Sequence, residues 1–256
     1  MTKDEDGTVI NKTASYAGDG GLQQVFAGVG FKVLDNLSIG ANISYIYGDI
    51  THSVTTAFSN SSSFSSVRLD KISINDYKLD FGLQYSYKFN KKHVLNFGAV
   101  YSLGHSVNGK GYKYNQKWLN GADYPSTQTG DTITNAFSLP HTFGAGLTYV
   151  YDNRLTIGAD FTYQQWEDAK FYNEKSYFSN RTKIAAGAEF VPNPYSRNYL
   201  KRVRYRVGGY YSDPYTKVDG QDGTREYGVS AGFGFPLFQS KSILNLSLIH
   251  ISEPTR

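Results

Sequence analysis

The sequence predicts an all-β fold, namely a transmembrane antiparallel up-and-down β-barrel of about ten strands. Three observations predict it: segments in which apolar and polar residues alternate, connections that alternate between short and long, and aromatic residues near the ends of the alternating segments. A membrane-spanning helix needs roughly 20 consecutive apolar residues, and no such run occurs. A barrel strand meets lipid only at every second residue, which is compatible with the mean hydropathy of −0.45.

Alternation with a period of two is typical of a strand whose two faces meet different surroundings. The clear segments lie at 37–48, 77–87, 95–104, 142–151, 155–164, 183–190 and 227–235, and weaker ones lie at 21–33, 202–211 and 242–246. The alternation assigns to the lipid face Leu79, Phe81, Leu147, Ile157 and Val229. It assigns to the lumen Asp80, Gly144, Asp160 and Gly232.

The connections between these segments fall into two length classes. Short turns are expected at 34–36, 89–92, 152–153 and 237–240, and a somewhat longer one at 192–200. Long polar loops are expected at 49–71, 105–138, 165–181 and 212–223. Such sorting is typical of a barrel with periplasmic turns and extracellular loops, and a soluble sandwich has no reason to adopt it.

This topology and the sequence of the C-terminal end divide the chain into three expected parts. Residues 1–19 are expected to be part of an extracellular loop, and 20–245 to be part of a barrel. Residues 246–256 resemble the translation of a transposon-end adapter from shotgun sequencing libraries, so we expect them to be a non-native tail. An odd number of strands is then expected to precede this segment and at least one to follow it. We therefore expect unpaired edges near 20–33 and 241–248, and no packing of 252–256.

Eight charged residues fall on the predicted lumen face. They are Lys78, Asp80, Asp160, Lys183, Glu189, Arg204, Arg206 and Glu226. One interpretation is a cross-strand network of ion pairs that stiffens the interior, and the other is a lining that selects the solute.

Aromatic residues are frequent in the predicted outer loops. Tyr112, Tyr114, Trp118 and Trp166, together with Phe171 and Tyr172, are candidates for an apolar capture site. They are also compatible with an interface belt or with packing that seals the loops.

Other functional classes find little support. The five histidines lack metal-ligand spacing, no Gly-x-Ser-x-Gly motif occurs, and there is no cysteine. The net charge is +4, but the basic residues are scattered rather than gathered in a stripe. We therefore expect no enzyme activity, catalytic residue, cofactor, metal or nucleic-acid partner.

Several stretches resemble outer-membrane proteins of Bacteroidetes and the FadL-type transporters of hydrophobic compounds. They are 36–45, 205–211, 226–237 and 241–245. The resemblance implies the bacterial outer membrane and a barrel of about 14 strands, which ten strands here, three before and one after would make. It also implies passive uptake of small hydrophobic compounds, such as long-chain fatty acids or aromatic hydrocarbons. The expected surroundings are membrane lipid and lipopolysaccharide. A general diffusion porin and a structural or adhesion barrel are the alternatives.

Overall fold

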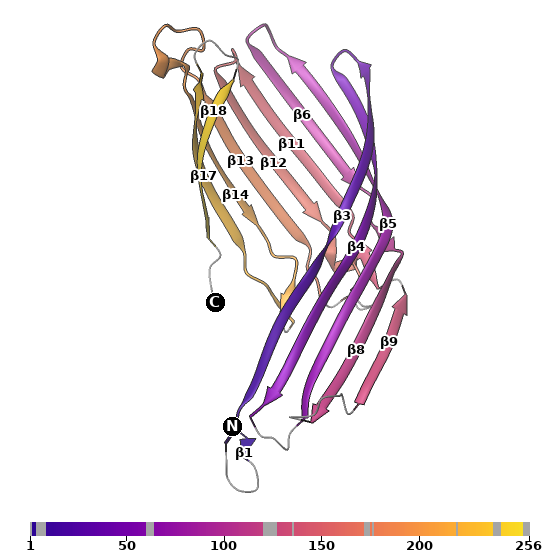
Figure 1. Cartoon of the computed structure of the whole chain (residues 1–256). Helices are drawn as coiled ribbons and strands as arrows, with labels where there is room; N and C mark the ends of the chain where they lie inside the picture. Colours follow the sequence, from indigo (N-terminus) through magenta and orange to yellow (C-terminus); the bar gives the residue numbers. More distant parts are fainter. Residues whose placement is uncertain are drawn as a thin grey trace.

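A computed structural model describes residues 2–3, 9–59, 64–119, 127–134, 136–171, 175, 177–218, 220–237 and 242–252. Ten strands form one continuous antiparallel meander (Figure 1). In sheet order they are β3 (Lys12–Leu34), β4 (Leu37–Phe58), β5 (Phe64–Lys88), β6 (His93–Ser102), β11 (Thr142–Tyr151), β12 (Leu155–Gln164), β13 (Arg181–Phe190), β14 (Arg204–Ser212), β17 (Glu226–Pro236) and β18 (Ile243–Ser252). The predicted fold class and strand number are confirmed. Within the described residues, no helix combines the length and apolar character that crossing a membrane requires.

The sheet curves around a hollow and stays open (Figure 1). Its edges are β3 and β18, and no described strand pairs with the outer side of either. All 23 residues of β3 are exposed. The predicted unpaired edges are confirmed, and they present backbone groups that a closed barrel would pair.

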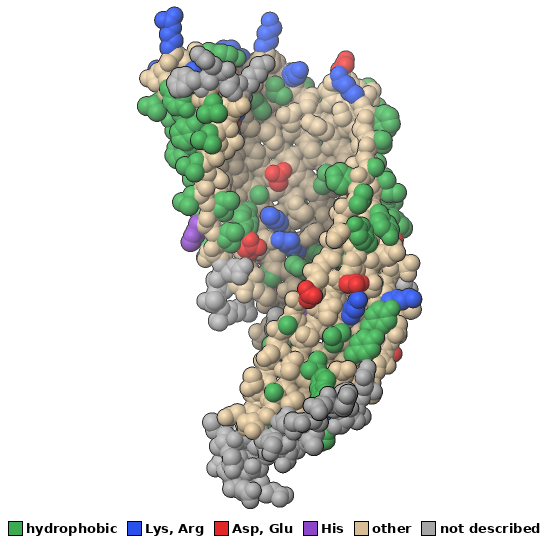
Figure 2. Space-filling model, in the orientation of Figure 1, with side chains coloured by type: hydrophobic (Ala, Val, Ile, Leu, Met, Phe, Trp, Pro, Cys, Tyr) green, Lys and Arg blue, Asp and Glu red, His purple; other side chains and the backbone are tan. Residues whose placement is uncertain are grey.

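The two faces of the sheet differ as the alternation predicts. Phe81, Leu147, Ile157 and Val229 lie on the convex face with 47–60% of their surface exposed, and Leu79 on the same face is half-buried. Figure 2 shows apolar side chains gathered on the outer surface, whereas the hollowed inner wall carries mainly backbone and small or polar groups with scattered charges. Because an apolar row facing outward is stable only in lipid, this arrangement is that of a membrane barrel.

Short turns join the strands at one end of the sheet. The turn between β11 and β12 contains Asp152 and Asn153 with φ values of 49° and 53°. Two successive positive φ values match the twist of a hairpin, and Asp and Asn tolerate them better than other non-glycine residues. The somewhat longer connection from β13 to β14 contains the 3-10 helix η2 (Tyr199–Arg202).

At the long-loop end the sequence-based expectation is wrong, because much of the expected loop at 49–71 is strand. β4 and β5 continue there, and residues 12–19 also belong to β3. At about 3.3 Å per residue, β3 reaches roughly 75 Å, although about 10 residues suffice to span a membrane. Sequence alternation failed here because a strand outside lipid needs no apolar row. Backbone pairing of β3 with β4 and of β4 with β5 maintains the strands there instead.

The expected loop at 105–138 also contains strands. They are β7 (His105–Val107), β8 (Gly109–Leu119), β9 (Thr127–Thr134) and β10 (Phe137–Leu139). β8 pairs with β5 and β9 with β8. We call this projecting sheet of 12–20, 49–58, 64–75, 109–119 and 127–134 the extension (Figure 1). The remaining elements are the short pairs β1 (Thr2–Lys3) with β2 (Val9–Ile10) and β15 (Lys217–Val218) with β16 (Gln221–Asp222), and the 3-10 helix η1 (Trp166–Asp168).

β18 extends into the stretch that resembles an adapter. Residues 246–252 pair with β17 in regular register, and the Ser252 hydroxyl donates to the Tyr227 hydroxyl at 3.3 Å. The expectation that Ser252 packs on nothing is therefore wrong, and 253–256 lie outside the described residues. Leu244, Leu246 and Leu248 alternate as in a barrel strand, which explains the pairing. The non-native origin of the tail stays a prediction.

The orientation of the sheet can be tested by labelling in intact cells. The chain has no cysteine, so Thr129→Cys on exposed β9 and Asn153→Cys in a short turn each introduce a unique thiol. We expect a membrane-impermeant maleimide to label the first variant in intact cells and both after lysis, because long loops face the medium. Labelling of Asn153→Cys alone in intact cells would show that the short turns, and not the long loops, face the medium.

Candidate functional site

The middle of the lumen wall carries almost no side-chain bulk. One cross-strand row runs through six neighbouring strands, β3 to β6 and then β11 and β12. Its members are Gly30, Gly40, Gly82, Val100, Gly144 and Thr162. A row dominated by glycine cannot pack a solid core, so the wall there is mostly backbone.

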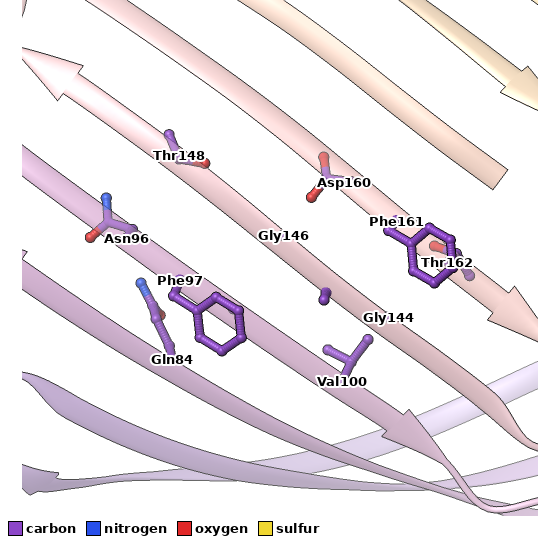
Figure 3. Close-up of a pocket in the computed structure, with 12 residues that line it drawn as sticks. Gln84, Asn96, Phe97, Val100, Gly144, Gly146, Thr148, Asp160, Phe161 and Thr162 are labelled. Carbon is purple, nitrogen blue, oxygen red and sulfur yellow. The ribbon is translucent and has the colours of Figure 1, made fainter.

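A cavity of about 290 Å³ lies against this wall (Figure 3). Figure 3 shows its polar side chains on four neighbouring strands, namely Gln84 on β5, Asn96 on β6, Thr148 on β11, and Asp160 with Thr162 on β12. The intervening lumen positions include Gly98, Gly144 and Gly146. The cavity therefore offers hydrogen-bonding groups beside an apolar lining that includes Phe97, Val100 and Phe161.

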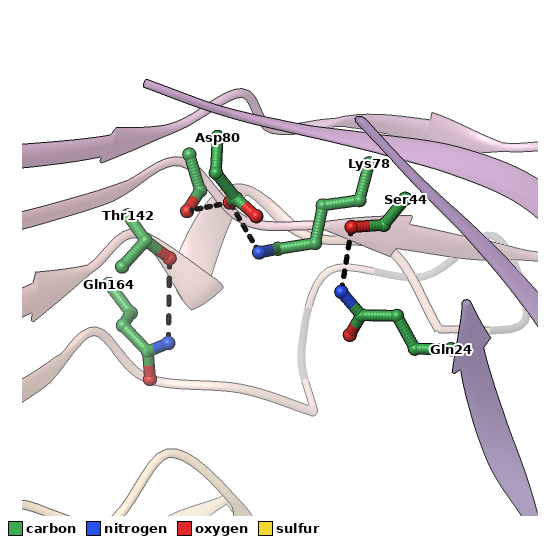
Figure 4. Close-up of polar contacts among 7 residues, drawn as sticks. Gln24, Ser44, Lys78, Asp80, Thr142 and Gln164 are labelled. Carbon is green, nitrogen blue, oxygen red and sulfur yellow. Dashed lines mark hydrogen bonds and ion pairs between the residues drawn. The ribbon is translucent and has the colours of Figure 1, made fainter. Parts of the chain in front are cut away.

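Polar contacts join neighbouring strands along the lumen face (Figure 4). Asp80 on β5 accepts hydrogen bonds from Lys78 and from the Ser102 hydroxyl of β6, the latter at 2.5 Å. Gln24 of β3 donates to the Ser44 hydroxyl of β4 at 2.7 Å. These bonds satisfy groups that face the interior and hold strand to strand.

A second network lies near the short-turn end. Glu189 on β13 accepts a hydrogen bond from Arg204 at 2.7 Å and another from Arg206 at 2.6 Å, and both arginines are on β14. Arg206 also donates to the Asn245 side chain on β18 at 2.7 Å. Two guanidinium groups on one carboxylate leave an excess positive charge at this end of the lumen.

A third network lies toward the long-loop end. The Tyr210 hydroxyl donates to Glu226, and the Lys183 ammonium lies 5.0 Å from the centroid of the Tyr210 ring. The three networks therefore engage seven of the eight charged residues that the sequence places in the lumen. Asp160 belongs to none of them.

An aromatic cluster stands where the long loops meet the lumen-side face of the extension. The Trp166 ring lies 5.2 Å from Tyr215, 5.3 Å from Phe178 and 6.4 Å from Phe137, measured between ring centroids. Phe171 lies 5.8 Å from Phe178. We call these five residues the aromatic cluster.

The aromatic cluster joins a small hydrophobic core. Ile46, Ile72, Ile74 and Val107 are buried there, and Phe137 and Phe171 pack against them. The Trp166 indole nitrogen donates to the Gln164 side chain at 3.2 Å, which fixes one edge of the ring. Apolar side chains thus cover the lumen-side face just beyond the predicted lipid band.

The family comparison matches nearly the whole chain. The family model described as BamG covers residues 1–252. The chain belongs to the BamG family. No curated protein sequence matches this BamG-family chain.

Solved structures similar to this BamG-family chain are outer-membrane β-barrel proteins. A FadL homologue of Pseudomonas aeruginosa matches with a TM-score of 0.58 and 16% identity over 91% of this chain and 60% of its own. The toluene transporter TbuX of Ralstonia pickettii matches with a TM-score of 0.55 and 14% identity over 91% and 67%. A chain of the RagAB peptide importer matches with a TM-score of 0.56 and 10% identity over 92% and 30%. The chain therefore spans less than two thirds of two of these proteins, namely 60% of the FadL homologue and 30% of the RagAB chain.

The fold and family confirm the resemblance and the location predicted from sequence. The BamG-family chain is an outer-membrane β-barrel protein. We expect the short turns to lie in the periplasm. On that expectation we call the long-loop end, where the aromatic cluster lies, the outer mouth of the lumen, and the short-turn end, near the Glu189 network, the inner mouth.

The predicted aromatic residues do not gather at one place. Trp166 is in the aromatic cluster. Tyr112 and Tyr114 stack on each other at 6.4 Å on β8, and their pairing with Lys71 and Leu69 sets them on the opposite face from Ile72 and Ile74. Trp118 shares their face, and Tyr172 lies outside the described residues.

Sequence reasoning missed three members of the aromatic cluster. Phe137, Phe178 and Tyr215 come from three separate connections. The frequency of aromatic residues in the long polar segments was the only available signal, because periodicity does not extend across loops.

An ion pair marks the outer face of the extension. Lys71 Nζ lies 2.9 Å from Asp49 Oδ2, and the hydrogen bond from Lys71 lowers the pKa of the Asp49 carboxyl. A lowered folded-state pKa contributes stability above the unfolded-state pKa, and this is lost as pH falls through the folded-state pKa. Both groups are well exposed, so solvent screening keeps the contribution small.

The histidines offer no metal site within the described residues. No group of three or more His, Asp or Glu side chains converges there. His105 is half-buried against β5, with Nε2 3.6 Å from Asp76 and its ring stacked on Tyr77 at 4.6 Å. This contact attaches β7 to the outer end of β5.

Proposed function

We propose that the protein passes small hydrophobic compounds, such as long-chain fatty acids or aromatic hydrocarbons, across the outer membrane by passive diffusion. The observation that carries this proposal is the aromatic cluster at the outer mouth, beside a hollow lumen. Such compounds cross the hydrophilic lipopolysaccharide layer poorly. A patch that binds them from water therefore raises their concentration at the entrance of the barrel.

The physical chemistry of the mouth is suited to capture. Removing apolar surface from water contributes about 25 cal/mol per Å², and aromatic rings contribute a further preference for stacked or edge-on contacts. The toluene transporter TbuX has the same fold, which supports hydrophobic cargo for this chain. The glycine row then offers an entering molecule a wide passage with few obstructing side chains.

The proposal is tested by uptake in cells with and without the full-length protein. We expect initial uptake of a radiolabelled long-chain fatty acid or of toluene to be faster when the protein is present. Glycerol uptake controls for leakage of the membrane. Equal fatty-acid and toluene uptake in both strains, together with sizeable ion conductance of the purified protein in planar bilayers, would contradict the transporter.

A general diffusion pore is the second candidate. The polar and glycine-rich lumen wall favours it, because water and ions pass such a surface readily. This function predicts high conductance and uptake of small hydrophilic solutes in proportion to their size. A transporter of hydrophobic compounds predicts low conductance, so the bilayer measurement separates the two.

A further inference from the structure

Asp160 differs from the other charged residues of the lumen. In the part of the chain that the structure describes, its carboxylate takes part in neither an ion pair nor a hydrogen bond. The ammonium of Lys183, on the next strand, lies over the Tyr210 ring instead. An unneutralised carboxylate against a protein wall attracts a cation from solution.

The wall is shaped around this carboxylate. Asp160 pairs across the strands with Gly146, and a Cβ added to Gly146 would lie only 2.3 Å from Asp160 Oδ1. Glycine therefore leaves the space into which the carboxylate points. Next to it, Gly98 pairs with Gly146 and keeps the approach open.

The groups around Asp160 add hydrogen-bond acceptors. The same cavity is lined by Thr148 and Thr162, whose hydroxyls accept hydrogen bonds, and by the side-chain amides of Gln84 and Asn96 (Figure 3). The Asn96 amide oxygen also accepts a hydrogen bond from the Ser86 hydroxyl at 2.6 Å, which leaves it one further lone pair. A single carboxylate with neutral oxygens does not match a divalent cation, which takes six or more oxygens with several charges. A primary ammonium has three N–H donors and one charge, which one carboxylate and two neutral acceptors satisfy.

We propose that Asp160, with Thr148, Thr162, Gln84 and Asn96, forms a binding site in the lumen for the ammonium group of an organic amine. The site is independent of the proposed function, because neither an aromatic hydrocarbon nor a fatty-acid carboxylate carries a cationic group that a carboxylate would bind. It lies on the wall of the lumen, so it binds an amine without closing the passage.

Calorimetric titration of the purified full-length protein with cadaverine, a small diamine, tests the site. Asp160→Asn keeps the shape of the side chain and removes its charge. We expect it to weaken cadaverine binding by about tenfold or more, as for loss of a charge-assisted hydrogen bond. Asp152→Asn is the matched control, because Asp152 lies in the β11–β12 turn and Asn tolerates its φ of 49°. It should bind as the unsubstituted protein does.

Gly146→Ala supplies a second variant that keeps every charge. The added Cβ displaces only the end of the Asp160 side chain, so the barrel should fold, and circular dichroism checks this. We expect binding to weaken again, since the carboxylate leaves the cavity. Absence of cadaverine binding to the unsubstituted protein, unchanged binding by Asp160→Asn, or an equal loss in Asp152→Asn would each overturn the site.

Discussion

Gly48→Ala is expected to destabilise the barrel more than a methyl added on the lumen wall. Gly48 has a φ of 145°, and a Cβ there would lie 2.2 Å from the carbonyl oxygen of Gly21 on the paired strand. Backbone cannot yield as the end of a side chain can, so strain and clash together should cost about 2–4 kcal/mol. Gly20 on β3 has a φ of 102° and the same conflict with the Asp49 carbonyl. The two glycines thus permit the bend where the extension leaves the barrel.

The measurement is the thermal unfolding of the refolded full-length protein, followed by circular dichroism and by heat-dependent gel mobility. Gly82→Ala is the control, because no atom lies within 4 Å of its added Cβ. It should change stability by no more than about 0.5 kcal/mol. Equal melting temperatures for Gly48→Ala and Gly82→Ala would show that the bend does not depend on glycine.

Trp166→Ala should reduce uptake of hydrophobic compounds by roughly tenfold at limiting concentration, the effect of removing a central aromatic anchor. The chain has two tryptophans, which supplies a matched pair. Trp118 lies on the opposite face of the extension from the core that joins the aromatic cluster, so Trp118→Ala should leave uptake unchanged. The measurement is the initial rate of toluene or fatty-acid entry at equal surface levels of each variant.

Trp166→Phe separates capture from folding. The smaller ring keeps aromatic contact with Phe178 and Tyr215 but loses the hydrogen bond to Gln164. We expect it to restore most of the uptake that Trp166→Ala loses. An equal loss of uptake in Trp166→Ala and Trp118→Ala would show that hydrophobic compounds do not enter through the aromatic cluster.

The strands that contact lipid could be predicted from the sequence, and the strands outside lipid could not. A strand between lipid and a lumen must alternate, so the ten strands and the faces of Phe81 and Asp160 followed from sequence. The sequence predicts loop for much of the extension, because its outer face meets water rather than lipid and no apolar row marks it. Its buried side chains, Ile72 and Ile74, depend on Phe137 and Phe171, which are distant in sequence.

The candidate site, like the fold, could be predicted only in part from the sequence. Strand parity placed the charged residues in the lumen, but the register was needed to show that Arg204 and Arg206 share Glu189 while Asp160 has no partner. The residues of the aromatic cluster come from separate connections between strands. Sequence periodicity does not describe how such connections fold. Of its five members, the sequence identifies Trp166 and Phe171, through their residue type.

The glycine row of the lumen wall has a kinetic consequence. On the lumen face, a neutral apolar molecule that moves past Gly40, Gly82 and Gly144 meets mainly peptide backbone and water, because apolar side chains of the same strands, such as Phe81 and Phe143, point to the outer face. For the proposed transport, we therefore expect a nearly flat free-energy profile along this stretch, with neither a deep well nor a steric barrier. The slow step is then departure from the aromatic mouth. The rate of uptake should therefore stop rising with external concentration once the aromatic cluster of every protein molecule is occupied.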